Sequence, residues 1–459
     1  MFKLLLILSI LSSTPELQDA NVATLVYDYQ TGDTIDAYRA NCVIPPASTI
    51  KLLTTATIAD HLGSDYQITT PITYSGYIED NTLHGNLYIE GRGDPTLGSQ
   101  YVGDSLLLQH WAEQIYNAGI HNINGSIVAD VSYFDVEATN PAWIWQDIGN
   151  YYAPGIQSLS YKDNTMKITL GSGAVGSLAK VLRTDPTIPE MQFDSYTRCE
   201  NISYDGAYVY GMPYSNYRYI AGKIPANRST FTIKGDLPNP ALLLVTDLAN
   251  TLITNGISVN GDITFITKQD TTKTTRTLLF QHKSAPLSEI IRHTNHKSDN
   301  LYAEMLYRIL GTRQEGSCTI NQSTNFIRTY WGERGVDLSS ARIMDGCGLA
   351  PQDAISPKMY IQLLRYMYES PNKESFIASL PCSGKSGTLK SFLKNTSLHG
   401  RVYAKSGTIG GTKNYAGYIF LPDGRVWIFA VMINSANCSS RTMQNAIEKY
   451  LLDVYTRNT

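Results

Sequence analysis

Two changes of pattern, near residues 65 and 277, constrain the fold of this chain most strongly. Before the first and after the second, helical and strand patterns both occur. Between them, short alternating segments are separated by frequent Gly, Asn, Asp and Pro, and only residues 105–117 have a long helical pattern. The sequence therefore predicts a strand-rich insertion within a domain that is built from both ends of the chain.

Strand patterns at the two ends predict one antiparallel sheet flanked by helices, an α/β (α+β) fold. Five strands are predicted, at residues 23–27, 34–40, 401–406, 415–420 and 426–433. The last two are joined by the turn sequence Leu-Pro-Asp-Gly. Helices are predicted at residues 48–62, around 287–310 and at 441–452. The first of these has few polar positions and ends at Gly63, which predicts a largely buried helix.

Length and charge limit the classes of protein that this chain can represent. It has 459 residues, whereas one hydrophobic core rarely serves more than about 250 to 300 residues. Two or three compact units are therefore expected. The formal net charge is −3 and no long run of Lys and Arg occurs, so nucleic acid and anionic membrane surfaces are excluded as partners.

The first residues are typical of a signal peptide. Met1-Phe2-Lys3 forms a short charged region, and the apolar run from Leu4 to Leu11 is too short for a membrane span of about 20 residues. No second segment is as hydrophobic, so no integral membrane span is predicted. We expect residues 1–20 to be a leader and the mature protein to be exported, either periplasmic or associated with the cell wall.

Cysteine and histidine do not form a metal motif. The six cysteines are an even number, which permits disulfides in an exported protein, but six allow 15 connectivities and none has the Cys-x-x-Cys spacing. His293 and His296 would need a third ligand that nothing nearby supplies. The sequence therefore predicts no metal and no cofactor, and leaves the cysteine pairing open.

Ser48-Thr49-Ile50-Lys51 is the first of three motifs that predict acyl-transfer chemistry. Residues three apart lie on one face of a helix, so the hydroxyl of Ser48 and the amine of Lys51 are expected to be neighbours. The helix dipole favours negative charge at this end, and apolar surroundings make a lysine lose its proton more easily. Alone, the motif is a weak signal, and a capping serine with a solvated lysine would be the preferred explanation if no other motif followed.

Two further motifs follow in the order found in penicillin-recognising serine enzymes. Ser298-Asp299-Asn300 precedes an apolar helix and, by itself, is also a good helix cap. Lys405-Ser406-Gly407-Thr408 ends a predicted strand, in which glycine would let a ligand approach the backbone. The order SxxK, SxN and K[ST]G is the signature of penicillin-binding proteins and class A β-lactamases.

A second match to the third motif, Lys385-Ser386-Gly387-Thr388, lies twenty residues earlier. It follows Pro-Cys-Ser-Gly, which is incompatible with a strand, whereas Lys405 follows an alternating segment. We therefore assign the motif to Lys405.

Two other segments resemble known motifs but carry no assignment. The segment Glu137 to Asn140 is reminiscent of the deacylating loop of β-lactamases, but it precedes the SxN motif. The tripeptide Arg92-Gly93-Asp94 is too short to indicate adhesion.

The chain resembles the low-molecular-mass class C penicillin-binding proteins, the D-Ala-D-Ala carboxypeptidases and endopeptidases of peptidase family S13. The resemblance covers about residues 22–435 and rests on six segments: Ala47–Leu52, Gly91–Leu97, Ser298–Glu304, Asp345–Leu349, Gly387–Leu389 and Ala404–Thr408. Three residues depart from the usual family pattern: Ser406 replaces the commoner Thr, Cys347 a Ser and Arg92 a Gly. None of these changes removes a catalytic group.

The resemblance implies a catalytic role for four residues. Ser48 would attack the carbonyl of the penultimate D-Ala, with Lys51 as its base, and Ser298, supported by Lys405, would relay a proton to the leaving amine. Substrate-binding residues are implied as well. They are Asn300 for the substrate amide, Ser406 and Thr408 for the terminal carboxylate, and Gly407 for close approach, with the N–H groups of Ser48 and Thr408 as the oxyanion hole.

The resemblance also implies a β-lactamase-like transpeptidase domain, at 21–64 plus 278–459, that carries a two-domain insertion. The inserted domains are expected at 65–165 plus 235–277 and, nested within the first, at 166–234. The implied partners are peptidoglycan stem peptides and β-lactam antibiotics as covalent inhibitors, and a homodimer is left open. Two other functions are compatible with the sequence: a serine β-lactamase or esterase on the same fold, and a non-catalytic cell-wall binding protein.

Overall fold

The computed structural model describes residues 11, 15–268, 274–312 and 318–459. The chain forms two compact units: Met1–Tyr66, Pro286–Gly311 and Ile320–Thr459 make up unit 1, and Gln67–Ala285 and Thr312–Thr319 make up unit 2. Unit 1 thus combines both ends of the chain. The chain returns to it at Pro286 instead of 278, because strand β17 (Thr277–Lys283) pairs with a strand of unit 2. The finer division of the insertion into two domains stays a prediction.

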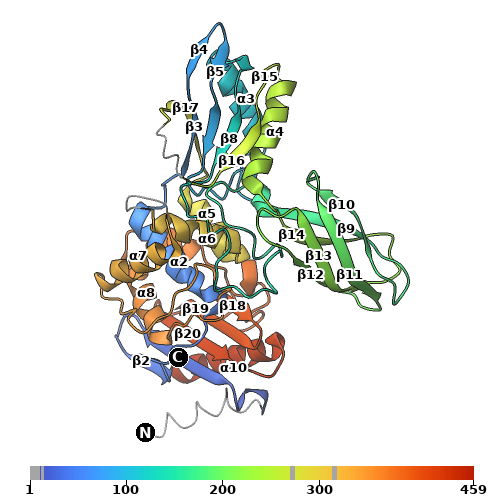
Figure 1. Ribbon diagram of the computed structural model, residues 1–459. Coiled ribbons are helices and arrows are strands. Elements are labelled where there is room, and N and C mark those ends of the chain that lie inside the picture. The colour runs from blue at the N-terminus through green and yellow to red at the C-terminus, as the bar shows by residue number, and fades with distance from the viewer. Residues whose placement is uncertain (1–10, 12–14, 269–273, 313–317) are drawn as a thin grey trace. The chain divides into compact units, whose positions relative to one another are not determined.

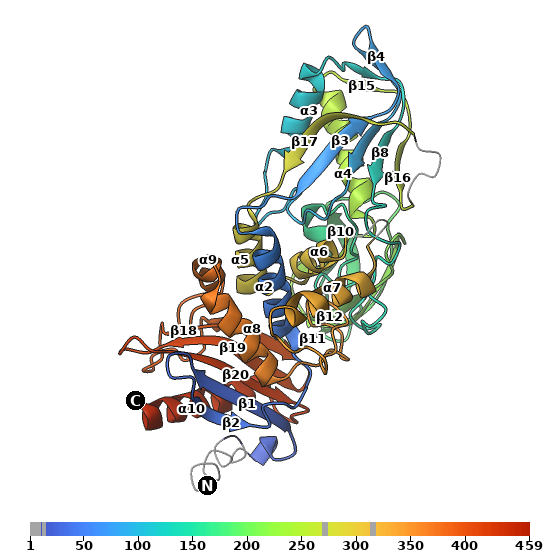
Figure 2. The ribbon, with the colours of Figure 1, turned by 90° about the vertical axis from the view of Figure 1, so that its left-hand side faces the viewer.

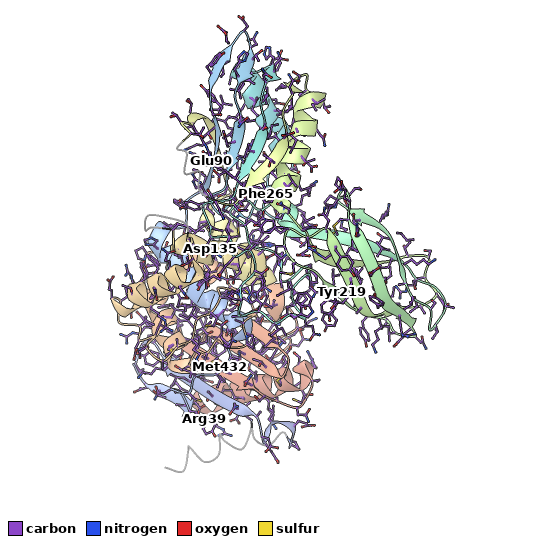
Figure 3. The ribbon with its side chains drawn as sticks, viewed as in Figure 1. Arg39, Glu90, Asp135, Tyr219, Phe265 and Met432 are labelled. Carbon is purple, nitrogen blue, oxygen red and sulfur yellow. The ribbon has the colours of Figure 1, made fainter. Side chains whose placement is uncertain are left out.

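Unit 1 is built on a five-stranded antiparallel sheet of order β18-β19-β20-β1-β2 (Figure 1). Its strands are β1 (Asn21–Asp28), β2 (Thr34–Tyr38), β18 (Val402–Ile409), β19 (Thr412–Phe420) and β20 (Val426–Asn434). Nearly every residue of β19 and β20 is buried, including Met432, which Figure 3 labels. The five predicted strands and their membership of one sheet are confirmed, and β18 lies at the edge.

Helices cover both faces of this sheet. On one face, Tyr418 of β19 donates to the carbonyl of Leu364 in α8 at 2.8 Å. On the other, Tyr415 packs in a hydrophobic cluster with Ile447 and Tyr450 of α10, and Figure 2 shows α8 and α10 on opposite sides. The helices of unit 1 are α2 (Lys51–Leu62), α5 (Leu287–Lys297), α6 (Asn300–Leu310), α7 (Ile320–Gly332), α8 (Pro357–Glu369), α9 (Lys373–Ala378) and α10 (Ser440–Asn458).

Helix α2 lies inside unit 1, as its sequence predicted. Every residue from Lys51 to Ala59 is buried, because the helix packs against α5, α6, α7 and α8. It ends at Gly63, whose φ of 85° favours glycine. A helix that is enclosed on all sides can hold its first turn, and therefore Lys51, in a fixed position.

The described residues of unit 2 form four sheets, of orders β16-β8-β6-β3-β17, β15-β7-β5-β4, β10-β9-β14 and β11-β13-β12. The strands not yet placed are β3 (Thr69–Tyr74), β4 (Tyr77–Glu79), β5 (Thr82–His84), β6 (Leu87–Glu90), β7 (Asn122–Ile123), β8 (Ile127–Asp130), β9 (Thr165–Gly171), β10 (Lys180–Asp185), β11 (Gln192–Glu200), β12 (Gly206–Tyr210), β13 (Tyr217–Pro225), β14 (Phe231–Asp236), β15 (Ser258–Val259) and β16 (Ile263–Ile266). The prediction of a strand-rich insertion is confirmed.

One prediction for the insertion is wrong. Besides α3 (Leu107–Asn117), unit 2 contains a second long helix, α4 (Pro240–Thr254). Its sequence, Pro-Ala-Leu-Leu-Leu-Val-Thr-Asp-Leu-Ala, has apolar residues on several faces and so gives little 3.6-residue contrast. Its start was nevertheless marked, because Asn239 caps the helix by accepting from the N–H of Leu242, and Pro240 occupies the first turn.

Several other sequence features can be placed. Most of the predicted leader, residues 1–10 and 12–14, lies outside the described residues. In the described part of the chain, no helix combines the length and hydropathy of a membrane span. The carboxyl group of Asp94 is buried and accepts from Thr96, so it is not an exposed adhesion residue. The following thiols form no disulfide: Cys42, Cys199, Cys347, Cys382 and Cys438.

Candidate active site

Ser48 and Lys51 are neighbours at the start of α2. The short 3-10 helix η2 (Ala47–Ile50) carries Ser48, and the Nζ atom of Lys51 lies 3.0 Å from Ser48 Oγ. Ala47 has a left-handed φ of 46°, a conformation that costs free energy for a residue with a Cβ atom and persists only where the surrounding structure holds it. The backbone just before Ser48 is therefore held in place by its surroundings.

Two contacts fix the segment that precedes Ser48. The side-chain amide of Asn414 in β19 donates to the carbonyls of Pro45 and Pro46, at 2.9 and 2.8 Å. Gly348 lies against Ala47, since a Cβ atom at this position would come within 2.1 Å of the Ala47 carbonyl oxygen. Only glycine permits this approach.

Lys51 joins three parts of unit 1 through one nitrogen atom. Besides Ser48 Oγ, Nζ lies 2.6 Å from Asn300 Oδ1 and 2.6 Å from the carbonyl oxygen of Cys347. Both of these oxygens can only accept. A neutral amine has two hydrogens and one lone pair, so when both hydrogens point at Asn300 and Cys347, the lone pair points at the Ser48 hydroxyl. The geometry therefore suits proton transfer from Ser48 to Lys51.

Burial favours this neutral form. Lys51 is completely buried, which lowers the pKa of its amine, while negative charge on Cys347, Asp345, Asp299 or Glu304 acts in the opposite direction. The lowered pKa increases the fraction of Lys51 that can act as a base near neutral pH.

Asp345 organises the loop that supplies the Cys347 carbonyl. Its two carboxylate oxygens accept from the backbone N–H groups of Cys347, Gly348, Leu349 and Ala350, at 2.6 to 3.1 Å. Glu304 in α6 accepts from the N–H of Gly346 at 2.7 Å. Glu304, Asp345 and Cys347 form a buried group of potential metal ligands, but these hydrogen bonds already give the two carboxylates a role in holding the loop.

The pKa of Glu304 gives a test of this buried network. Burial, with the nearby Asp345, raises the pKa from its usual 4.5 to about 8. Because the native carboxyl holds its proton more tightly than the unfolded one, its contribution to stability is full below pH 4.5 and is lost as the pH rises to 8. Glu304→Gln stays neutral and keeps the acceptor for Gly346.

The wild type should lose stability as the pH rises from 5.5 to 8, whereas Glu304→Gln should not. We therefore expect the unfolding free energy of Glu304→Gln, measured relative to the wild type, to increase by about 1 to 3 kcal/mol when the pH is raised from 5.5 to 8. Urea unfolding at the two pH values measures the difference. The exposed Glu374 offers a matched control, because Glu374→Gln should show no such change. An equal difference between variant and wild type at both pH values would mean that Glu304 is ionised throughout.

Ser298 and Lys405 form the second part of the site. Ser298 ends α5 in the left-handed conformation, with φ 59°, and Asp299 caps α6 by accepting from the N–H of Tyr302. The predicted capping role of the motif is thus confirmed for Asp299. Lys405 Nζ donates to Ser298 Oγ at 2.9 Å and to the carbonyl of Ser406 at 2.8 Å. Burial lowers the pKa of Lys405 well below its usual range, and Lys51 and Lys413 lower it further.

The edge strand β18 supplies the rest of the site. A Cβ atom on Gly407 would lie 2.5 Å from the Pro46 carbonyl oxygen and 3.1 Å from the Ser48 nitrogen, so Gly407 is needed for η2 to lie against β18. Thr408, one residue on, is exposed. An edge strand presents backbone groups that an extended peptide can pair with.

The structure also distinguishes the two Lys-Ser-Gly-Thr sequences. Lys405 lies on β18, whereas Lys385 lies in a loop that leads into the 3-10 helix η4 (Gly387–Leu389), so the choice of strand is confirmed. The earlier copy still reaches the site, because Ser406 Oγ donates to Thr388 Oγ1 at 2.7 Å.

Sequence analysis gave no role to four residues that contact the site. The Asn414 side chain donates to two backbone carbonyls, and Cys347 contributes its own carbonyl, so both contacts involve backbone atoms that side-chain patterns do not reveal. Thr388 was set aside with the second motif. Lys413 donates to Thr408 Oγ1 at 2.9 Å. The sequence feature that could have drawn attention to it is a charged residue in a strand whose residues are nearly all buried.

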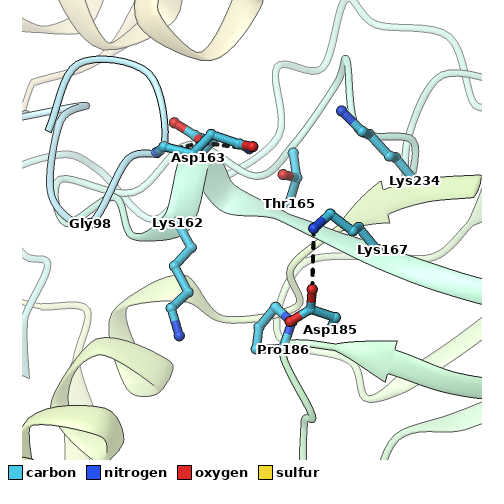
Figure 4. Close-up of a pocket in the computed structure, with 9 residues that line it drawn as sticks. Gly98, Lys162, Asp163, Thr165, Lys167, Asp185, Pro186 and Lys234 are labelled. Carbon is cyan, nitrogen blue, oxygen red and sulfur yellow. Dashed lines mark hydrogen bonds and ion pairs between the residues drawn. The ribbon is translucent and has the colours of Figure 1, made fainter. Parts of the chain in front are cut away.

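Unit 2 contains a separate pocket of about 170 Å³. Figure 4 shows lysines and aspartates on its wall, and Lys167 pairs with Asp185 at 3.2 Å. The pocket contains none of the residues of the three motifs; its lining residues are Gly98, Gln100, Lys162, Asp163, Thr165, Lys167, Asp185, Pro186 and Lys234.

Known proteins resemble this chain in fold and in sequence. Penicillin binding protein 4 (dacB) of Haemophilus influenzae has a similar structure, with a TM-score of 0.84, 22% identity and 98% of each chain covered. A second structure of that protein, complexed with a novel β-lactam, has a TM-score of 0.79 and 21% identity, and covers 98% of this chain and 99% of that one. The fold is therefore that of a penicillin-binding protein.

The sequence comparison identifies the family. A D-alanyl-D-alanine carboxypeptidase of Actinomadura sp. (strain R39) is 27% identical over 455 residues, which cover 94% of this chain and 81% of the relative. The family profile described as D-Ala-D-Ala carboxypeptidase 3 (S13) matches residues 6–454. This chain belongs to the D-Ala-D-Ala carboxypeptidase 3 (S13) family, as its motifs predicted.

Proposed function

We propose that this protein is a serine-type D-Ala-D-Ala carboxypeptidase and endopeptidase, which cleaves peptidoglycan peptides through an acyl-enzyme on Ser48. The observation that carries the proposal is the arrangement around Lys51. Its amine lies 3.0 Å from the Ser48 hydroxyl, and two acceptor oxygens occupy its remaining hydrogens. Family membership supplies the substrate class.

Acylation follows from these contacts. Lys51 takes the proton of Ser48 while Ser48 Oγ bonds to the carbonyl carbon of the penultimate D-Ala. The C–N bond then breaks, and Ser298 relays a proton to the leaving amine. Lys405 supports this step because its amine donates to Ser298 Oγ. Water subsequently attacks the ester and releases the shortened peptide.

Substrate binding is assigned to groups along β18 and α6. Asn300 would hold the substrate amide, and the hydroxyls of Ser406 and Thr408 its terminal carboxylate. Gly407 would allow the peptide to approach the strand. The backbone N–H groups of Ser48 and Thr408 would stabilise the oxyanion of the tetrahedral intermediate.

β-Lactams are proposed as covalent inhibitors that acylate Ser48, since the Haemophilus relative has been solved in complex with one. We further propose that the protein is exported and acts in the periplasm or at the cell wall. The apolar N-terminal segment supports this location, as does a substrate class that is found outside the cytoplasm.

Two measurements on the wild-type protein test the proposal. Incubation with a labelled penicillin should give a covalent adduct that persists, whereas turnover within seconds would favour a β-lactamase or esterase. Mass analysis of digested muropeptides should show loss of terminal D-Ala, splitting of cross-linked dimers, or both. If muropeptides bind but no bond is cleaved, the protein is a non-catalytic cell-wall binding protein.

A further inference from the structure

Lys413 lies beside the residue proposed to bind the substrate carboxylate. Strands β18 and β19 are antiparallel, and Lys413 is directly opposite Thr408. Its Nζ atom donates to Thr408 Oγ1 at 2.9 Å and lies 5.6 Å from the ring centre of Tyr415. Lys413 is only 9% exposed, whereas Thr408 is exposed. The lysine therefore reaches ligands through the threonine hydroxyl.

On this side of the site, two amines lie without a carboxylate partner among the described residues. None of the ion pairs found in the described parts of the chain includes Lys405 or Lys413, and both amines bond to neutral oxygens. Burial lowers the pKa of both, and Lys413 also lowers that of Lys405. A buried ammonium group without a counter-ion is costly, so an anion that binds here from outside would stabilise the protonated form of these amines.

The bond to Lys413 also orients the Thr408 hydroxyl. An ammonium group has no lone pair, so the Thr408 oxygen accepts from Lys413 and its own hydrogen must point elsewhere. A hydroxyl that accepts from a cation becomes a stronger donor. The acceptor that suits such a donor is an anionic oxygen, and a peptide C-terminus supplies one.

We propose that Lys413 is a positioning residue that makes the enzyme specific for substrates ending in a free carboxylate, by orienting and polarising the Thr408 hydroxyl. The inference rests on the proposed function and deepens it. A purely structural role, in which Lys413 only ties β19 to β18, would affect all substrates equally.

Two peptides separate these roles. One is an N-acylated peptide that ends in D-Ala-D-Ala with a free carboxylate, and the other is the same peptide with a C-terminal carboxamide. Lys413→Met should lower the ratio of their kcat/KM values about 10- to 100-fold, the usual effect of losing a charged hydrogen bond. The loss should fall on the carboxylate peptide and mainly on its KM.

Two variants serve as controls. Lys413→Arg keeps the charge and the donor and should retain most of the wild-type preference, whereas Lys394→Met, which removes an exposed lysine of unit 1, should leave it unchanged. An unaltered ratio in Lys413→Met, or equal losses for both peptides, would overturn the inference. A wild-type protein that forms no penicillin adduct would instead overturn the proposed function, and this inference with it.

Discussion

Ser48→Ala is expected to abolish the covalent penicillin adduct and to reduce D-Ala release about 10⁴- to 10⁶-fold. Ser48 Oγ is the oxygen that lies 3.0 Å from the Lys51 amine, and alanine leaves no atom to form the ester. Mass spectrometry of the intact protein measures the adduct, and peptide mapping should place it on the segment that contains Ser48. Release of D-Ala from a pentapeptide measures turnover.

The second Lys-Ser-Gly-Thr sequence offers a matched control for this experiment. Ser386 also lies next to a lysine in the sequence, but its hydroxyl accepts from the backbone N–H of Cys382. Ser386→Ala should therefore keep both the adduct and the turnover. An adduct that survives Ser48→Ala would assign the nucleophile to another residue and remove the basis of the mechanism.

Lys51→Met is expected to slow acylation about 10²- to 10⁴-fold, the usual contribution of a general base. The wild-type acylation rate should rise with pH, since only the deprotonated amine can accept the Ser48 proton. Because burial lowers the pKa of Lys51 from 10.5, this rise should occur at a lower pH than for an exposed lysine. Stopped-flow measurement of penicillin acylation between pH 5 and 10 tests both points.

Lys51→Arg distinguishes a base from a positive charge. Arginine keeps the charge and the donors but does not lose a proton in this pH range. If Lys51 is the base, both variants should be slow and their rates should lack the wild-type rise with pH. Recovery of the wild-type rate by arginine would show that the charge alone is required. Thermal melting should confirm that both variants are folded.

The terminal segments were predicted well because each contained its own local pattern. Strands β1, β2, β18, β19 and β20 alternate in the sequence or lie next to turn residues, and α2 ends at a glycine as expected. Helix α4 was missed because its apolar residues do not follow one face. The boundary at Pro286 was displaced because the pairing of β17 with β3 depends on a partner more than 200 residues away in the sequence, which local patterns do not identify.

Some features of the candidate site could likewise be predicted from local sequence. The spacing of Ser48 and Lys51 on one helical turn was sufficient to predict their contact. The order of the three motifs then indicated the class of enzyme, and the alternation before Lys405 distinguished the copy of the third motif that lies on a strand. These inferences depend on residues that are close together in the sequence, or on the order of segments along it, and both can be read directly from the sequence.

Only the tertiary structure revealed what surrounds the two lysines. Lys51 bonds to Asn300 and to the Cys347 carbonyl, 249 and 296 positions away, and these contacts hold its amine 3.0 Å from Ser48 Oγ. Lys413 reaches Thr408 because β19 pairs with β18 in one particular register. Such contacts depend on the order and register of the strands. They also depend on which backbone carbonyls lie close enough to a buried amine to accept a hydrogen bond from it. The sequence by itself predicted the candidate reacting groups, whereas packing between distant segments decided their surroundings and orientation.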